Sequence, residues 1–286
     1  MIKSIAIDMD GTLINKKQSI SKENIEAIEK AKAKGIEVVI ATGRSFQEAS
    51  HALSEAGIKS SIIGINGAVV LDPDGHIVEA NALDFESVRK AADILKKLDL
   101  YYEIYTNQGT YSQDKDKSLA LLVDIFLTSN PGADPVVVTE EARKRFEVSQ
   151  IKIVDSYERL FENPEIVYYK FLVFSVDFKK LGEAASELKQ VGSLAVTASG
   201  RDNLEINALD AQKGVALEKY LNKLGIPLED TMAIGDNYND VSMFERVGRS
   251  VAMGNAPADI QRICDFVTAS NNENGVAKAI LEAIGE

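Results

Sequence analysis

The stretch SIAIDMDGTLI, from Ser4 to Ile14, decides the fold because a short apolar run ends in two aspartates. The run is too short for a buried helix and is typical of a strand inside a parallel sheet. Residues two apart in an extended chain project to the same side, so the carboxylates of Asp8 and Asp10 can face one site. Two like charges this close repel each other, and a nearby cation would offset that repulsion.

Composition limits the classes of protein that this chain can represent. Its 286 residues suffice for two domains, and an apolar fraction of 45% supports a buried core. The net charge of −12 argues against a nucleic acid or an anionic membrane as partner, since both need a basic surface. Cys264 is the only cysteine, which excludes an internal disulfide. With neither a secretory signal nor an apolar run near the ~20 residues that span a bilayer, we expect a soluble cytoplasmic protein, a monomer or a homodimer.

The order of the expected elements predicts an interrupted α/β fold. Strand and helix alternate in both terminal parts of the chain, which indicates a Rossmann-like parallel sheet covered by helices on both faces. The middle part is of α+β character, with two hairpins and longer helix–strand pairs. We therefore expect a core built from residues 1–82 and 209–286, interrupted by a cap domain at 83–208. The expected core elements are strands at 4–8, 36–44, 61–68, 231–235 and 250–254, and helices at 21–35, 45–57, 213–225 and 240–248, followed by a closing helix.

Polar residues follow the expected core strands at the points where the strands end. In an open parallel sheet these carboxyl ends meet at one edge, where ligands bind. Carboxylates without histidine or cysteine form a hard oxygen site that suits Mg²⁺, while a hydroxyl, backbone amides and a lysine suit a phosphoryl group. The residues delivered to this edge are Asp8, Asp10, Gly11, Thr12, Thr42, Gly43, Arg44, Lys213, Gly214, Gly235, Asp236, Asn237, Asn239 and Asp240.

Each of these signals is weak when taken alone. An Asp-x-Asp-Gly sequence can begin a calcium loop of the EF-hand type, but the twelfth position, counted from Asp8, is Ser19 instead of the required glutamate. His51 and His76 lack the partners of a nucleophile–base pair, and we interpret both as structural or exposed. The joint occurrence of the strand-end residues, in this order, favours a phosphoryl-transfer site.

Four motifs of the chain resemble those of the haloacid dehalogenase superfamily. They are DMDGT at 8–12, ATGR at 41–44, KG at 213–214 and GDNYNDVSM at 235–243. The Thr-Gly-Arg form of the second motif, the NGA at 66–68 and the long cap between the second and third motifs resemble the Cof-like branch, class IIB. The resemblance implies a Mg²⁺-dependent phosphatase of small phosphorylated metabolites, with sugar phosphates as the favoured class.

The resemblance also implies a role for each matching residue. Asp8 is the expected nucleophile, and Asp10 the expected proton donor and then base. The expected metal ligands are Asp8, the backbone carbonyl of Asp10, and Asp236. Asp240 is expected to orient Lys213 or a metal-bound water. The expected phosphate- or substrate-binding residues are Thr42, Gly43, Lys213, Asn239, Arg44, Asn66 and Gly67.

The substrate stays open at this point. A phosphatase of flavin or pyridoxal phosphates is an alternative, because the tyrosines of the cap permit a planar leaving group. A non-enzymatic phospho-accepting domain of receiver type also uses aspartates, a threonine and a lysine around Mg²⁺. Such a domain would be about half this length and would lack both the cap and an aspartate two residues after the acceptor. The Tyr105–Tyr111 hairpin is a candidate for contacts to the leaving group, and Glu205 matches a recurring position of the family.

Overall fold

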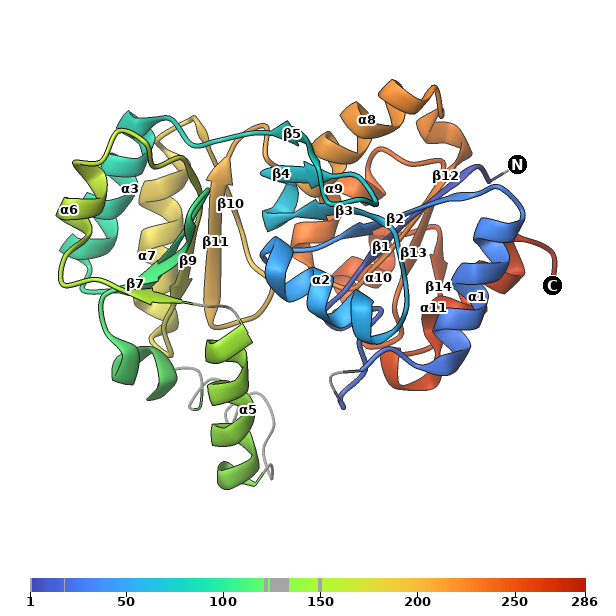
Figure 1. The fold of residues 1–286 in the computed structure, drawn as a ribbon, viewed down its shortest axis with the longest axis horizontal. Helices are drawn as coiled ribbons and strands as arrows, with labels where there is room; N and C mark the ends of the chain where they lie inside the picture. The colour runs from blue at the N-terminus through green and yellow to red at the C-terminus, as the bar shows by residue number, and fades with distance from the viewer. Residues whose placement is uncertain (1, 18, 121–122, 124–133, 149–150) are drawn as a thin grey trace. The chain divides into compact units, whose positions relative to one another are not determined.

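A computed structural model of the chain describes residues 2–17, 19–120, 123, 134–148 and 151–286. The chain folds as two compact units (Figure 1). The core unit comprises Met1–Asn81 and Asp210–Glu286, and the inserted unit comprises Ala82–Leu209. Among the described residues, no helix combines the length and the apolar character needed to cross a membrane.

The core unit is built on an eight-stranded sheet with the order β14-β13-β12-β1-β2-β3-β4-β5. Its strands are β1 Ser4–Asp8, β2 Glu37–Ala41, β3 Ser61–Gly64, β4 Val69–Leu71, β5 Ile77–Ala80, β12 Thr231–Gly235, β13 Arg249–Ala252 and β14 Phe266–Val267. The first strand pairs in parallel with both β12 and β2, with Ile7 opposite Ile234 and Asp8 opposite Ala41. The carboxyl ends of these three strands therefore lie side by side, as the α/β prediction requires.

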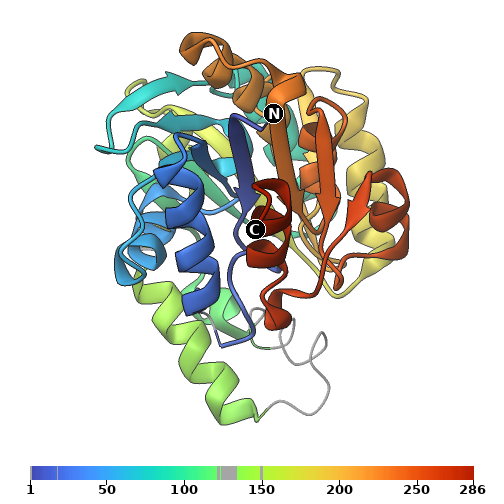
Figure 2. The same cartoon turned by 90° about the vertical axis from the view of Figure 1, so that its right-hand side faces the viewer.

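Helices cover both faces of this sheet. They are α1 Lys22–Ala33, α2 Phe46–Glu55, α8 Lys213–Leu224, α9 Val241–Phe244, α10 Ala258–Ile263 and α11 Gly275–Ala283. One apolar cluster joins α8, α9 and α10 to the face on which Ala6, Val39 and Ala233 lie. The helices α1 and α11 pack side by side over the other face (Figure 2). Side chains cap two of these helices: Ser21 accepts from the backbone N–H of Asn24 at the start of α1, and Ser45 accepts from the backbone N–H of Glu48 at the start of α2.

The third core strand is shorter than predicted. It ends at Gly64, because Ile65 and Asn66 adopt left-handed φ angles of 51° and 57° and form the short 3-10 helix η1, Ile65–Gly67. The chain then returns as β4 and β5, which pair antiparallel with their neighbours. The hairpin around the Asp-Pro-Asp-Gly turn at 72–75 thus extends the core sheet at one edge and makes it mixed there.

The prediction of a helix over 240–248 is wrong in its extent. After the 3-10 turn η3, Tyr238–Asp240, the helix α9 covers only Val241–Phe244. Gly248 donates its N–H to the carbonyl of Leu228 at 2.8 Å, beside the 3-10 turn η2, Leu228–Asp230. A Cβ at position 248 would lie 2.0 Å from the carbonyl oxygen of Glu229. This close backbone approach takes the chain out of the helix and into β13. The sequence analysis also missed α10, β14 and the turn η4, Asn271–Glu273.

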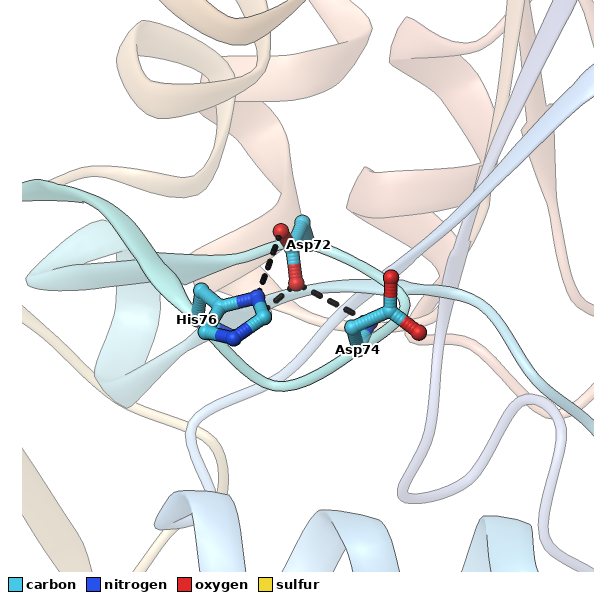
Figure 3. A group of neighbouring side chains, drawn as sticks. All are labelled: Asp72, Asp74 and His76. Atoms are coloured by element: carbon cyan, nitrogen blue, oxygen red, sulfur yellow. Dashed lines mark hydrogen bonds and ion pairs between the residues drawn. The ribbon is translucent and has the colours of Figure 1, made fainter.

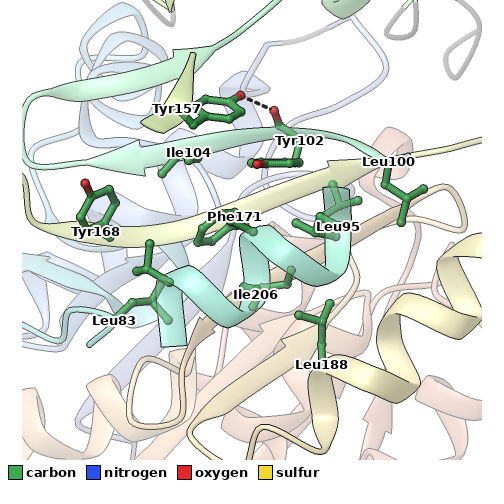
Figure 4. Packing of buried hydrophobic residues seen from close by; sticks show 14 of the residues in the cluster. Leu83, Leu95, Leu100, Tyr102, Ile104, Tyr157, Tyr168, Phe171, Leu188 and Ile206 are labelled. Atoms are coloured by element: carbon green, nitrogen blue, oxygen red, sulfur yellow. Dashed lines mark hydrogen bonds between the residues drawn. The ribbon is translucent and has the colours of Figure 1, made fainter. Parts of the chain in front are cut away.

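The inserted unit is an α+β unit with a six-stranded sheet in the order β10-β11-β9-β6-β7-β8. Its elements are α3 Phe85–Lys97, β6 Tyr101–Thr106, β7 Gly109–Ser112, α5 Pro135–Val148, β8 Lys152–Ile153, α6 Tyr157–Phe161, β9 Tyr168–Phe174, α7 Phe178–Lys189, β10 Leu194–Thr197 and β11 Asn203–Ala208. One face of the sheet packs an apolar cluster with α3, α6 and α7 (Figure 4). Phe171, Ile104 and Ile206 of neighbouring strands are fully buried in it.

Alternation along the strands gives the other face of this sheet polar residues. Lys170 Nζ donates to Glu205 Oε1 at 2.8 Å, and both side chains are buried. The ammonium group also lies 4.7 Å from the ring centroid of Tyr105. Glu205, whose role the sequence left open, is therefore one half of a buried ion pair inside the inserted unit. Tyr105 and Tyr111 are themselves buried.

Candidate active site

The site is organised around Lys213, the first residue of α8. Its ammonium group donates to Asp8 Oδ1 at 2.6 Å and to Asp240 Oδ1 at 2.7 Å, and all three side chains are buried. Asp8 is the last residue of the central strand β1, whereas Asp240 ends the turn that follows β12. Two acids from different strand ends and one lysine are thus joined at the carboxyl edge of the sheet.

The turn after β12 is shaped by Asp240. Its second carboxylate oxygen, Oδ2, accepts the backbone N–H groups of Asp236 at 2.9 Å and Asn237 at 3.0 Å. This closes the loop and leaves Oδ1 for Lys213. Of the two expected contacts of Asp240, the structure contains the one to Lys213.

Asp236 completes a cluster of three buried carboxylates. Oxygen atoms of Asp8, Asp236 and Asp240 all lie within 4.8 Å of one another. The hydroxyl of Thr12, which is fully buried, donates to Asp236 Oδ1 at 2.9 Å. The carboxylate of Asp236 also lies against Gly11, which has a φ of +78°, and a Cβ at that position would be 2.4 Å from Asp236 Oδ2. Only glycine fits this turn.

The electrostatics of the cluster reflect an excess of negative charge. Burial, with a further contribution from the charge of Asp240, raises the pKa of Asp8 well above its ordinary value. The same two causes raise the pKa of Asp236 to about 7. Burial acts to lower the pKa of Lys213, but the charges of Asp240 and Asp8 outweigh it and hold the ammonium charged. One ammonium group does not balance three carboxylates.

This donor set fits a divalent cation of the Mg²⁺ type. The cluster offers carboxylate oxygens only, without nitrogen or sulfur donors, and is buried enough that its charge is poorly solvated. Asp8 and Asp236 are the residues that would hold the ion, since Asp240 Oδ1 is engaged by Lys213 and its Oδ2 by backbone amides. Bound there, Mg²⁺ would neutralise the carboxylates and the charge of a phosphoryl group.

The residues expected to bind phosphate or substrate lie on adjoining turns. Thr42 directly follows β2 and is buried, and the half-buried Gly43 comes next. The backbone N–H of Asn66 donates to the carbonyl of Thr42 at 2.9 Å, which brings the turn after β3 to the turn after β2. Asn239 Nδ2 donates to Asn66 Oδ1 at 3.3 Å, so the turn after β12 is connected to them as well.

Backbone packing requires a glycine at position 67. Its φ is +100°, and a Cβ there would lie 2.6 Å from the carbonyl oxygen of Gln212, the residue before Lys213. Close packing of two backbones therefore accounts for this glycine, which the sequence analysis had grouped with the substrate-binding residues.

Arg44 and Asp10 pair with each other. Arg44 Nε donates to Asp10 Oδ2 at 2.8 Å and Nη2 donates to Asp10 Oδ1 at 2.6 Å. Unlike the buried cluster, the side chain of Asp10 is 52% exposed. The sequence analysis placed Arg44 among substrate-binding residues and did not foresee this contact.

The glycine of the third motif was also not explained by the sequence. A Cβ on Gly214 would lie 1.8 Å from the carbonyl oxygen of Ser242, and the N–H of Gly214 donates to Ser242 Oγ at 3.0 Å. The start of α8 thus packs directly on the backbone of α9. The glycine at a predicted helix start is the sequence signal for such an approach, because glycine is the default residue where two backbones come close.

Two other features of the described residues lie apart from this cluster. Asp72, Asp74 and His76 gather in the β4–β5 hairpin (Figure 3), where Asp72 Oδ1 accepts from the backbones of Asp74 and His76 and closes the turn. His76 is largely exposed, as expected. A cavity of about 420 Å³ lies in the inserted unit beside α3, α6 and β6, and none of the predicted site residues lines it.

The chain is similar to known proteins over almost its whole length. Residues 5–280 match the family of haloacid dehalogenase-like hydrolases. Phosphatase YwpJ of Bacillus subtilis strain 168 is 39% identical over 96% of this chain and 98% of its own length. The 5-amino-6-(5-phospho-D-ribitylamino)uracil phosphatase YwtE of the same strain is 39% identical over 96% of each chain.

Among solved structures, a haloacid dehalogenase-like hydrolase from B. subtilis superposes with a TM-score of 0.89 at 39% identity, covering 98% of this chain and 99% of that one. The inserted unit lies between Arg44 and Lys213 in the sequence, where the Cof-like class IIB resemblance places a cap. The chain therefore belongs to the haloacid dehalogenase-like hydrolases, and it is a phosphatase, as its four motifs predicted.

Proposed function

We propose that this phosphatase hydrolyses small phosphorylated metabolites, with sugar phosphates as the favoured class, by a Mg²⁺-dependent reaction through an aspartyl-phosphate on Asp8. The observation that carries the proposal is the contact of Lys213 with both Asp8 and Asp240 beside the carboxylate of Asp236. An acid whose charge is held by a lysine and a metal can attack a dianionic phosphate, because the repulsion between them is offset.

In the first step an oxygen of Asp8 attacks phosphorus, and the bond from phosphorus to the leaving oxygen breaks. The carboxyl group of Asp10 gives its proton to that leaving oxygen. In the second step water attacks the phosphorus of the aspartyl-phosphate, and the carboxylate of Asp10 takes a proton from the water. Phosphate leaves, and the Asp8 carboxylate and the protonated Asp10 are restored.

The other site residues hold the phosphoryl group during both steps. Lys213 and the turn of Thr42 and Gly43 supply a charge, a hydroxyl and a backbone amide to its oxygens, and Asn239 adds an amide. Asn66 positions Asn239 through the hydrogen bond between their side chains. Asp240 positions Lys213 and closes the turn that carries Asp236.

The test is phosphate release from a panel of sugar phosphates, pyridoxal phosphate, flavin mononucleotide and nucleotides, with Mg²⁺ and with a chelator. We expect release from at least one sugar phosphate that stops with the chelator and in Asp8→Asn. Asp10→Asn should retain a phosphorylated protein, because the base for the second step is missing. Release that persists in Asp8→Asn would contradict the mechanism.

A phosphorylated ribitylaminouracil is the second candidate substrate. Two relatives, 39% and 32% identical, carry the name of a 5-amino-6-(5-phospho-D-ribitylamino)uracil phosphatase. This compound contains a polyol phosphate and a planar ring, so it has features of both the sugar phosphates and the heterocyclic phosphates. It belongs in the panel, and a kcat/KM at least tenfold above that of every sugar phosphate would make it the preferred substrate.

A further inference from the structure

The guanidinium group of Arg44 grips Asp10 with two parallel hydrogen bonds. Nε reaches Oδ2 at 2.8 Å and Nη2 reaches Oδ1 at 2.6 Å. Such a fork fixes the plane of the carboxylate as well as its distance, which a single contact would not do. The Asp10 side chain is 52% exposed, so the fork fixes the orientation of a solvent-accessible carboxylate.

Arg44 is itself held in place by the backbone on both sides. Its N–H donates to Thr42 Oγ1 at 3.1 Å, and its carbonyl accepts from the N–H of Ile65 at 3.0 Å. The next residue, Ser45, caps α2 in a reciprocal pair with Glu48, whose carboxylate accepts from both the N–H and the hydroxyl of Ser45. The guanidinium therefore extends from a backbone anchored at three points.

We propose that Arg44 is a positioning residue for Asp10, and that it acts through Asp10 instead of binding the substrate. The inference rests on the proposed function, in which Asp10 moves the protons. Guanidinium N–H groups can donate but never accept. The fork fixes the plane of the Asp10 carboxyl group, and with it the direction in which its oxygens face the leaving group. When Asp10 is a carboxylate, the fork holds it ready for the water.

The two possible roles of Arg44 differ in how its loss depends on the substrate. A sugar phosphate needs a proton on its leaving oxygen, whereas p-nitrophenolate departs as an anion. Loss of a positioning residue therefore slows the first step for the sugar phosphate and spares it for p-nitrophenyl phosphate. Loss of a substrate ligand raises KM, and the size of this effect does not depend on whether Asp10 is present.

The experiment compares Arg44→Met and Arg44→Lys with the wild type on the best sugar phosphate and on p-nitrophenyl phosphate, by rapid quench. For Arg44→Met we expect a single-turnover rate on the sugar phosphate lower by roughly 100-fold, the lower end of what a general acid supplies. KM should stay within about twofold. The burst of p-nitrophenolate should persist while steady turnover slows. Arg44→Lys should recover only a small part of the single-turnover rate that Arg44→Met loses, because an ammonium group cannot form the fork.

A double-mutant cycle separates a role through Asp10 from an independent one. In the Asp10→Asn background, Arg44→Met should cause no further loss, since the group that it positions is gone. Arg89→Met is the matched control, because Arg89 pairs with Glu158 on the surface of the inserted unit. It should leave both rates unchanged. Unfolding temperatures of all variants show that each is folded.

The outcomes divide cleanly. Additive losses in the cycle, equal losses on both substrates, or a raised KM at unchanged kcat would overturn the inference and leave the phosphatase mechanism standing, provided that turnover still requires Asp8. Turnover that does not require Asp8 would overturn the proposed mechanism and this inference together.

Discussion

Lys213 Nζ lies 2.6 Å from Asp8 Oδ1 although 205 positions separate the two residues in the chain. The contact joins the last residue of β1 to the first residue of α8, on either side of the inserted unit. Lys213 Nζ also lies 2.7 Å from Asp240 Oδ1, so one ammonium group pairs with two buried carboxylates.

Replacing Lys213 should therefore abolish most activity. For Lys213→Met we expect kcat to fall by about 10²–10³-fold, the loss found when one preorganised donor to a developing charge is removed. Steady-state phosphate release measures it. Lys219→Met is the control, because Lys219 also belongs to α8 but pairs with Glu79 near the surface. Equal losses in the two variants would show that the helix, and not the ammonium group, matters.

Gly214→Ala should destabilise the core unit. The new Cβ would lie 1.8 Å from the carbonyl oxygen of Ser242, so α8 or α9 must shift and carry Lys213 with it. We expect a loss of about 3 kcal/mol in the free energy of unfolding, the upper part of the usual range for overpacking. Circular dichroism during chemical denaturation measures the change, since the chain has no tryptophan.

Gly182→Ala provides the matched control with the opposite sign. Gly182 lies inside α7, and a Cβ there meets nothing within 4 Å. Alanine should stabilise the inserted unit by about 0.5–1 kcal/mol, because it restricts the unfolded chain and favours the helix. A destabilising effect of Gly182→Ala would contradict this assignment.

Lys170→Met should destabilise the inserted unit by about 3–5 kcal/mol, because it leaves the carboxylate of Glu205 buried without its ammonium partner. The double variant Lys170→Met/Glu205→Met should lose much less, since neither charge of the pair is then left buried without the other. Denaturant unfolding of the two single variants and the double variant measures the coupling. Strictly additive losses would argue against the pair as the cause.

The stability of the metal-free protein should depend on pH through Asp236. Its pKa is raised from 3.8 to about 7 in the folded state, so the folded protein holds a proton that the unfolded chain releases. The contribution of this proton to the free energy of unfolding is fully present below about pH 4 and is lost as the pH rises through about 7. In chelator, the unfolding temperature should therefore be lower at pH 8 than at pH 6.

Mg²⁺ should reverse this trend, because it competes with the proton for the same carboxylates. We expect a larger Mg²⁺-induced rise in the unfolding temperature at pH 8 than at pH 6. In Asp236→Asn both the pH dependence in chelator and the effect of Mg²⁺ should diminish. An equal effect of Mg²⁺ on this variant and on the wild type would place the ion elsewhere.

The sequence predicted those parts of the site that depend on the order of the strands. Asp8 ends one of three parallel strands, and Thr42 and Asp236 directly follow the other two, so their meeting at one edge required only the α/β pattern. The meeting of these strand ends is a consequence of topology, which a periodic pattern encodes. Lys213 was also predicted at this edge, at the start of a helix, but its burial was not.

Other features depend on side-chain conformation or on the approach of distant backbones, which no local pattern encodes. The Arg44–Asp10 fork needs both side chains to adopt matching rotamers across 34 positions. The early ends of β3 at Gly64 and of α9 at Phe244 follow from left-handed residues and from the contact of Gly248 with Leu228.

The pairing of β1 with β12 has a consequence for the synthesis of the chain. Until Gly235 has left the ribosome, the strand that carries Asp8 has one edge without its partner, although the inserted unit is already complete. An unpaired edge of a buried, apolar strand is a template for association with other chains. A nascent chain that pauses after the inserted unit has emerged but before β12 has emerged should consequently need a chaperone more than one that pauses after β12 is outside.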